Sequence, residues 1–184
     1  MTKEARDTPA APRRPQAVEI VHLSGDTLQA LAEGDLARAN ETSPIALSAY
    51  LAEPDARAVW TLRRDQTAAD PSAAAWVTGV IWDTAHSRAV GRAGYHAPPD
   101  ADGMVEIGYE VDPAYRRRGY ARAAFEALLQ RADHEPDVRT VRVTIAPDNE
   151  ASLNLAAHYD FSEVGEQWDE EDGLEIVFER PARH

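Results

Sequence analysis

The sequence predicts an α+β fold, with a mixed, mostly antiparallel central sheet and helices on both of its faces. Apolar and polar residues alternate over several short stretches, as in half-buried strands, whereas residues 121–132 have the spacing of an amphipathic helix. From residue 76 the order is strand, strand, strand, helix, strand, helix, strand, strand, which differs from the regular alternation of a doubly wound sheet. The clearest predicted strands cover residues 17–23, 76–82, 89–96, 105–111, 141–145 and 174–179.

The composition indicates one domain, with a negative net charge that either favours cationic or amine partners or simply keeps the chain soluble. A chain of 184 residues suits a single domain, and we expect residues 1–16 to be a disordered, proline-rich leader before a domain over residues 17–184. No stretch approaches the roughly 20 apolar residues of a membrane helix, and the N-terminus does not resemble a secretory signal. We therefore expect a cytoplasmic protein without a membrane partner. The net charge of −13 argues against nucleic acid and favours amine partners.

The stretch between the first two predicted strands is expected to be helical. A first helix begins after the N-cap candidates Ser24 or Asp26 and continues through residue 36, with Gly34 weakening its interior. A second helical segment is expected over residues 43–51, and a third from residue 53 to just before residue 70. The residues of this third helix that we expect to face the core are Ala58, Val59 and Leu62.

Residues 104–132 are the stretch around which the remaining elements are arranged. Alternating apolar residues at 105–111 predict a strand, and Pro113 ends it because proline lacks the donor that a strand needs. The following helix is expected to bury one stripe of side chains. These are Ala121, Ala124, Phe125, Leu128, Leu129 and Ala132.

The turn between this strand and helix carries the candidate chemistry. Its sequence is Arg116-Arg117-Arg118-Gly119-Tyr120-Ala121. The first amides of a helix lack intrahelical acceptors and carry the positive end of the helix dipole, and small residues let a ligand approach the backbone closely. The turn therefore predicts a phosphate or pyrophosphate site. It is neither a Walker loop nor a Gly-x-Gly-x-x-Gly dinucleotide fingerprint.

This turn resembles the R/Q-x-x-G-x-G/A signature of the GNAT N-acetyltransferase superfamily. The resemblance extends over roughly residues 76–180, because a further strand at 141–145 and a helix opened by Asn149-x-x-Ser152 follow in the expected order. The Glu-Ile-Gly-Tyr segment at 106–109 and the Asp-Gly-Leu-Glu segment at 172–175 most resemble the branch of ribosomal-protein N-terminal acetyltransferases (RimJ/RimL type).

The resemblance implies an acetyl-CoA-dependent N-acetyltransferase without a metal. It would move the acetyl group to a primary amine, such as a protein N-terminus, an amino acid or a small amine, by direct attack in a ternary complex. A homodimer is compatible with it. The Val111 amide would lie near the thioester carbonyl. The residues implied to bind acetyl-CoA are Tyr109, Val111, Arg116, Arg117, Arg118, Gly119, Tyr120, Ala121, Arg122, Asn149 and Ser152.

Two carboxylates are candidates for the catalytic base, and the catalytic acid is not identified by the sequence. Glu106 and Glu110 lie on one face of the central strand if the alternation holds, and either is a candidate base; a bulge between them would separate the two. The position where relatives carry a tyrosine that protonates the leaving thiolate is Ala156, and Tyr159 is expected in the core. A non-catalytic acyl-CoA-binding protein is therefore the alternative.

Two expectations concern the C-terminal part of the chain. Asp160 should occupy a left-handed turn after the second helix, with Phe161 packing into the core. Residues 167–173 should form an acidic hairpin turn, which is either a solvated loop or a site for a cationic substrate.

Overall fold

The computed structural model describes residues 16–170 and 173–184, and its centre is a seven-stranded sheet in the order β1-β2-β3-β4-β5-β7-β6. All neighbouring strands pair antiparallel except β4 and β5, which are parallel. The predicted fold class is confirmed. The strands are β1 (Val18–Val21), β2 (Gly79–Asp83), β3 (Arg88–Tyr95), β4 (Met104–Val111), β5 (Thr140–Ile145), β6 (Ser162–Asp169) and β7 (Gly173–Pro181). The predicted leader falls largely on residues 1–15, outside the described residues.

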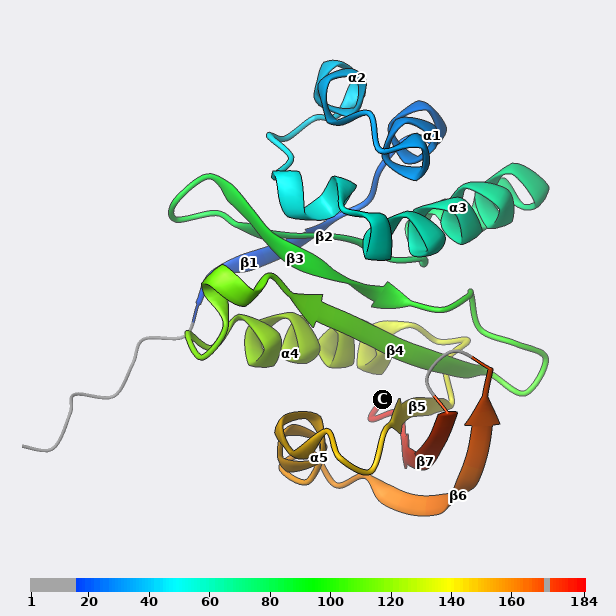
Figure 1. Ribbon diagram of the computed structural model, residues 1–184. Helices are drawn as coiled ribbons and strands as arrows, with labels where there is room; N and C mark the ends of the chain where they lie inside the picture. Colours follow the sequence, from blue (N-terminus) through cyan, green and yellow to red (C-terminus); the bar gives the residue numbers. More distant parts are fainter. Residues whose placement is uncertain (1–15, 171–172) are drawn as a thin grey trace, which may run out of the picture.

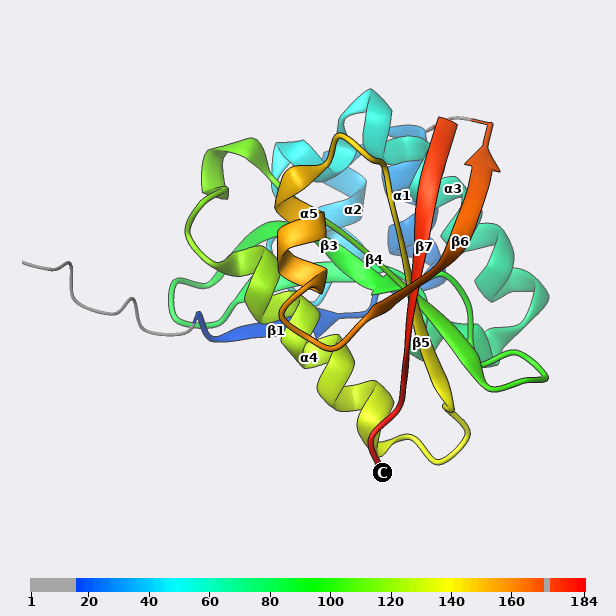
Figure 2. The ribbon, with the colours of Figure 1, turned by 90° about the horizontal axis from the view of Figure 1, so that it is seen from below.

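Helices cover both faces of the sheet. Figure 1 shows α1, α2 and α3 above β2 and β3, with α4 below them; the view from below in Figure 2 brings α4 and α5 to the front. The α-helices are α1 (Gly25–Glu33), α2 (Leu36–Thr42), α3 (Pro54–Ala69), α4 (Tyr120–His134) and α5 (Glu150–Ala156), and the short 3₁₀ turns are η1 (Ala49–Ala52), η2 (Pro71–Ala75) and η3 (Pro113–Tyr115).

Two hydrophobic clusters, one on each face, hold these layers together. The alternation in β4 places Val105, Ile107 and Val111 against Phe125 and Leu128 of α4 in the larger cluster. The predicted stripe of α4 is buried as expected apart from Ala121, which is half-buried. The second cluster lies under α1–α3 and is centred on Trp60, which is fully buried.

The N-terminal helical region differs from the prediction in three ways. Gly34 ends α1 in a left-handed conformation (φ 75°), and Asp35 then caps a separate α2, so the predicted first helix is two helices. The segment predicted as helical over 43–51 forms only the short turn η1. In α3 the buried residues are Ala56, Trp60 and Arg63. The large indole of Trp60 sets the buried face of α3, so the prediction that Ala58, Val59 and Leu62 face the core was wrong.

Both strands of the C-terminal hairpin extend further than expected. Residues 167–169 belong to β6, where Trp168 pairs with Leu174 of β7. The middle of the predicted acidic turn, residues 171–172, lies outside the described residues. Asp160 adopts the expected left-handed conformation (φ 58°), and Phe161 packs against the larger cluster.

The feature that positions the site is the parting of β4 from β5. The two strands pair only where Met104, Val105 and Glu106 face Thr140, Val141 and Arg142. Beyond Glu106, β4 remains paired with β3 while β5 pairs with β7. The sheet therefore opens between β4 and β5 toward the C-terminal end of β4.

Candidate active site

The predicted anion-binding turn enters α4 through a residue in the left-handed backbone conformation. Gly119 is the N-cap residue, with φ 91°, and contributes no side-chain capping bond. Among the described residues, a Cβ at this position would meet only Gln16 Cγ, at 3.8 Å. The backbone conformation, rather than crowding, is therefore what favours glycine here. Arg117 also has a positive φ, of 60°. The turn directs the first amides of α4 toward the groove described below.

A buried carboxylate fixes this turn to the β2–β3 hairpin. Asp83 is fully buried, and its Oδ2 accepts hydrogen bonds from Tyr120 Oη (2.6 Å) and Arg88 Nε (3.2 Å) and contacts His86 Nδ1 (2.8 Å). Burial alone would raise the pKa of Asp83, but the hydrogen bonds from Tyr120 and His86 outweigh it and leave the pKa below its ordinary value. The Tyr120 side chain is thus committed to the interior, and a ligand could meet this residue only through its backbone.

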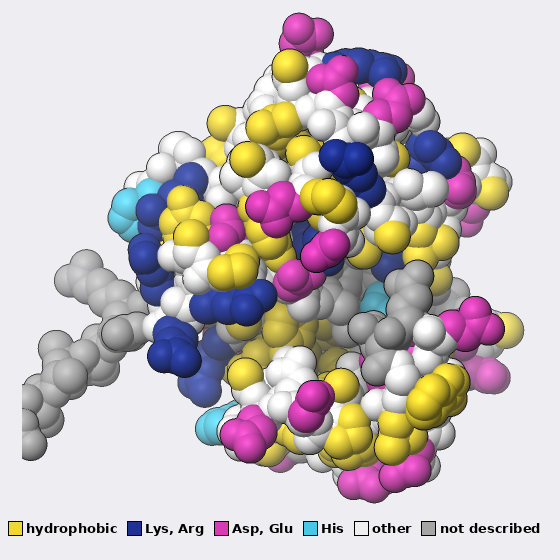
Figure 3. Space-filling view, in the orientation of Figure 1, with side chains coloured by type: hydrophobic (Ala, Val, Ile, Leu, Met, Phe, Trp, Pro, Cys, Tyr) yellow, Lys and Arg dark blue, Asp and Glu magenta, His cyan; other side chains and the backbone are white. Residues whose placement is uncertain are grey.

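A groove of about 600 Å³ runs along this turn between the end of β4 and α5. Figure 3 shows Lys and Arg side chains gathered beside a hollow on this face. Arg116 Nε donates to Val111 O (3.0 Å), which ties the turn to the last residue of β4. The predicted cofactor-binding residues that line the groove are Tyr109, Val111, Arg116, Arg117, Gly119, Tyr120, Ala121, Arg122, Asn149 and Ser152. Of the predicted set only Arg118 is not among the lining residues; its guanidinium lies over the ring of Tyr115, 5.5 Å from the centroid.

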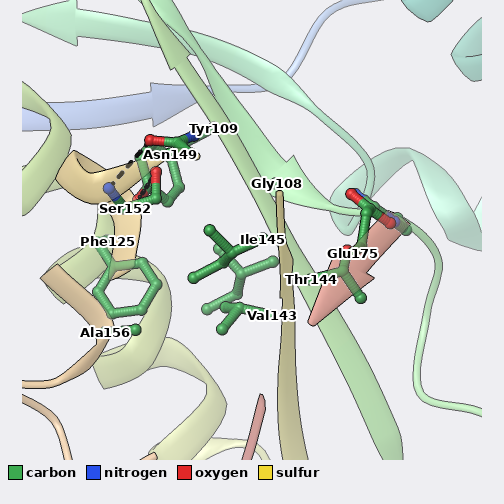
Figure 4. A pocket seen from close by; sticks show the side chains of 12 residues that line it. Gly108, Tyr109, Phe125, Val143, Thr144, Ile145, Asn149, Ser152, Ala156 and Glu175 are labelled. Carbon is green, nitrogen blue, oxygen red and sulfur yellow. Dashed lines mark hydrogen bonds between the residues drawn. The ribbon is translucent and has the colours of Figure 1, made fainter. Parts of the chain in front are cut away.

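A smaller cleft of about 190 Å³ lies where β4 and β5 part. It shares Tyr109, Asn149 and Ser152 with the groove. Figure 4 shows these three on one side and Thr144 and Glu175 on the other, with Gly108 between. Tyr109 Oη donates to Ser152 Oγ (2.9 Å), and Ser152 N donates to Asn149 Oδ1 (3.1 Å). The cleft therefore connects the groove beside α5 with the opposite face of the sheet.

The two candidate carboxylates lie on that opposite face, but in different surroundings. The β3–β4 register is regular from Ile107 to Val111, so no bulge separates Glu106 from Glu110. Glu110 pairs with Arg92 of β3 and accepts a hydrogen bond from Tyr50 of η1. Glu106 accepts a hydrogen bond from Thr144 Oγ1 (2.7 Å), and its side chain is 16% exposed. Glu106 is thus beside the cleft, whereas Glu110 is held in an ion pair.

The residue that sequence reasoning missed is His96, immediately after β3. It lines the cleft, and its Nδ1 lies 3.6 Å from Glu106 Oε1. A lone histidine at a strand end carries no signal in the sequence. Its meeting with Glu106 depends on the β3–β4 pairing, in which His96 N donates to Glu106 O (2.8 Å).

The α5 side of the cleft lacks the tyrosine that the resemblance implies. Ala156 is buried and lines the cleft. The Tyr159 ring packs against Phe125 at 5.3 Å between centroids, as expected for a core residue, and its hydroxyl donates to Glu126. Tyr109 places a phenol at the junction of cleft and groove. Burial raises the pKa of Tyr109 above its ordinary value, and the hydrogen bond to Ser152 opposes this rise only in part.

Within residues 16–170 and 173–184, His, Asp and Glu side chains nowhere converge in a group of three or more suited to a metal ion. Over the same residues, none of the helices has the length and apolar character required to cross a membrane.

Comparison with known proteins gives consistent matches. Residues 27–162 match the family model described as an acetyltransferase (GNAT) domain. L-2,4-diaminobutyric acid acetyltransferase of Streptomyces anulatus is 31% identical over 117 residues, which covers 57% of this chain and 65% of that protein, just under two thirds of its length. Among solved structures, a mutant spermidine N-acetyltransferase from Vibrio cholerae has a TM-score of 0.62 at 15% identity, covering 90% of this chain and 94% of the other. A ribosomal L7/L12 α-N-protein acetyltransferase in complex with coenzyme A has a TM-score of 0.60 at 15% identity, with 94% and 97% covered.

Proposed function

Because this chain belongs to the GNAT acetyltransferase family, we propose that it transfers an acetyl group from acetyl-CoA to a primary amine by direct attack in a ternary complex. The observation that carries the proposal is that the arginine-lined groove and the cleft at the parting of β4 and β5 share Tyr109, Asn149 and Ser152. The far end of the cleft is lined by Thr144, which donates to Glu106. A cofactor in the groove and an amine beside Glu106 would meet at the cleft.

The proposed cofactor site follows the groove. The amides at the start of α4 and the side chains of Arg116, Arg117 and Arg122 hold the pyrophosphate. The pantetheine arm extends along the unpaired edge of β4, where Tyr109, Glu110 and Val111 have β3 on one side only. The Val111 amide, or another amide of this edge, stabilises the thioester oxygen as charge develops on it.

The proposed acceptor is a cationic primary amine. Glu106 and Glu175 line or flank the cleft on the acceptor side, and the chain carries a net charge of −13. Similar proteins act on diaminobutyric acid, spermidine and ribosomal proteins, as their names state. We assign the acceptor to this broad class. The branch of ribosomal-protein acetyltransferases remains our proposal for its nearest relatives.

The leaving thiolate needs a proton that Ala156 cannot give. We propose that Tyr109, hydrogen-bonded to Ser152 at the junction of groove and cleft, supplies it directly or through water. Ser152 lies one helical turn before Ala156 on α5, so the hydroxyl pair stands close to the position where the resembled family carries a tyrosine.

The first prediction tests the activity. The purified chain should release free CoA from acetyl-CoA in the presence of at least one amine from a panel of L-2,4-diaminobutyrate, spermidine and a peptide with a free N-terminal alanine. Mass spectrometry should show one acetyl group added to that amine, and omission of the amine should stop CoA release. Tight binding of acetyl-CoA by calorimetry without turnover of any amine would instead support the non-catalytic alternative, which the alanine at position 156 favours.

A further inference from the structure

His96 is fixed at the mouth of the cleft by side chains from the other layer of the protein. Its carbonyl oxygen accepts hydrogen bonds from Arg63 Nη1 (3.0 Å) and Gln66 Nε2 (2.9 Å), both on α3. Arg63 is only 6% exposed, and its Nε also donates to Thr78 Oγ1 (3.0 Å). Helix α3 therefore fixes the backbone of His96 in the β3–β4 connection.

The imidazole is aimed across the central strand. Nδ1 faces Glu106 Oε1 at 3.6 Å, and Nε2 lies over Gly108, where a Cβ would come within 2.7 Å of it. A carboxylate beside Nδ1 favours the neutral tautomer that carries its proton there, which leaves the Nε2 lone pair available. Gly108 is the cleft residue midway between the Tyr109–Ser152 pair and Glu175.

We propose that His96 is the catalytic base that removes a proton from the acceptor's ammonium group, with Glu106 as its positioning residue. The inference rests on the proposed acetyl transfer and adds the group that makes the amine nucleophilic. An imidazole is a stronger base than a carboxylate and is therefore the better match for an ammonium group at neutral pH.

The charges around His96 allow this role. Partial burial lowers its pKa most, the carboxylate of Glu106 on β4 raises it, the guanidinium of Arg63 on α3 lowers it, and Glu175 on β7 raises it. The net pKa is below the ordinary value of about 6.5. At pH 7 the ring is therefore mostly neutral and can accept a proton.

The step balances without another reactant. His96 Nε2 takes one proton from the ammonium, and the nitrogen lone pair attacks the thioester carbonyl carbon. The C–N bond forms, the C–S bond breaks, and sulfur leaves with the bonding pair. Tyr109 gives its hydroxyl proton to the thiolate and regains the second proton lost by the nitrogen, directly or through water. His96 returns the first proton to solvent, so one proton is released per turnover.

The second prediction is tested with His96→Ala and the amine of the panel that the wild type turns over fastest. General bases typically contribute about 10²–10⁴-fold, so kcat/KM at pH 7 should fall at least a hundredfold. The defect should shrink toward pH 10, because free amine then forms without a base. Added imidazole should restore part of the rate at pH 7. Glu106→Gln should move the acidic limb of the pH–rate profile to lower pH, since it removes the carboxylate that raises the His96 pKa.

His134→Ala is the matched control, because His134 lies in the last turn of α4, outside the groove and cleft. Its profile should equal that of the wild type. If the wild type turns over the amine and His96→Ala is equally fast, or is slowed equally at every pH without imidazole rescue, His96 is not the base and the acetyltransferase assignment stands. If the wild type binds acetyl-CoA but acetylates no amine of the panel, both proposals are overturned.

Discussion

At the scale of the residue, Asp83 shows how one carboxylate holds in place the turn that we propose binds the pyrophosphate. Its carboxylate accepts hydrogen bonds from the hydroxyl of Tyr120, the first residue of α4, and from the guanidinium of Arg88 on β3. Arg88 also donates to Tyr120 Oη (2.9 Å) and lies over the ring of Tyr115, 4.8 Å from its centroid. A buried carboxylate is costly unless hydrogen bonds compensate its lost hydration, and here those bonds come from the start of α4 and from the β2–β3 hairpin.

The third prediction follows from the lowered pKa of Asp83. Because the carboxyl is more acidic in the folded state, its stabilising effect is complete above the unfolded pKa of about 3.9 and is lost as the pH falls through the lower folded pKa. The difference in the free energy of unfolding between the wild type and Asp83→Asn should therefore be constant from pH 5 to 7 and shrink in stronger acid. Urea unfolding across this range measures it. Tyr120→Phe, which loses both the bond to Asp83 and the bond from Arg88, should cost at least about 1.5–3 kcal/mol at pH 7. A difference independent of pH would contradict the role of the ionised carboxylate.

At the scale of the element, the start of α4 lacks the side-chain cap that would stabilise it. A serine, threonine or aspartate at the N-cap would bond to the amides of the first turn, whereas Gly119 leaves them without a side-chain cap. By contrast, Ser24, Asp35 and Asn149 cap α1, α2 and α5 with their side chains. We interpret the glycine as a means of keeping the α4 amides accessible to the pyrophosphate.

The fourth prediction is that Gly119→Ala weakens acetyl-CoA binding at least tenfold while the fold persists. A left-handed conformation costs a non-glycine residue on the order of 1–3 kcal/mol, and the turn can relieve that strain only by moving its amides. Gly165→Ala is the control, because a Cβ there meets nothing within 4 Å and β6 lies away from the groove. Calorimetry with acetyl-CoA compares the two variants. Unchanged affinity in Gly119→Ala would show that the turn does not hold the pyrophosphate.

At the scale of the whole molecule, a positively charged groove lies on a protein whose net charge is negative. The chain has a net charge of −13, yet Arg116, Arg117 and Arg122 line the groove proposed for the anionic cofactor. The opposite face, with Glu106 and Glu175, follows the overall sign. The overall negative field would attract the proposed cationic acceptor, whereas the local arginines would have to overcome it to bind the proposed cofactor.

The fifth prediction follows from this field. The KM for a triamine acceptor should rise several-fold between 50 and 300 mM salt, because screening weakens attraction between charges that are more than a Debye length apart. The KM for a monoamine should rise less. Initial rates at saturating acetyl-CoA measure both. An equal response of the two amines would show that the net charge of the chain does not assist acceptor binding.

The sequence predicted those parts of the fold and site that depend on local pattern. The alternation of β4, the buried stripe of α4 and the Gly119 turn are set by residues close together in the chain, and all are present. Glu106 and Glu110 were expected on one face, and the regular β3–β4 register confirms it.

Features that depend on distant contacts could not be predicted. Arg63 is buried because it bonds to Thr78 and to the carbonyl of His96, and an arginine in a helix ordinarily indicates a solvent-facing position. His96 gains its place from α3 and from β4 together. No spacing within the sequence brings those three segments to one point.

The position of His96 over Gly108 also limits the order in which these two residues can be substituted during evolution. A methyl group at position 108 would lie 2.7 Å from His96 Nε2, so alanine there displaces the imidazole while the strand itself is unaffected. Once another residue has replaced His96, the same alanine has no imidazole to displace. If His96 is the base proposed above, substitution at 108 is harmful before the loss of His96 and unopposed by the imidazole after it. Divergence at this pair of positions has a preferred direction: a lineage that gives up the histidine is free to lose the glycine, and return then requires both changes.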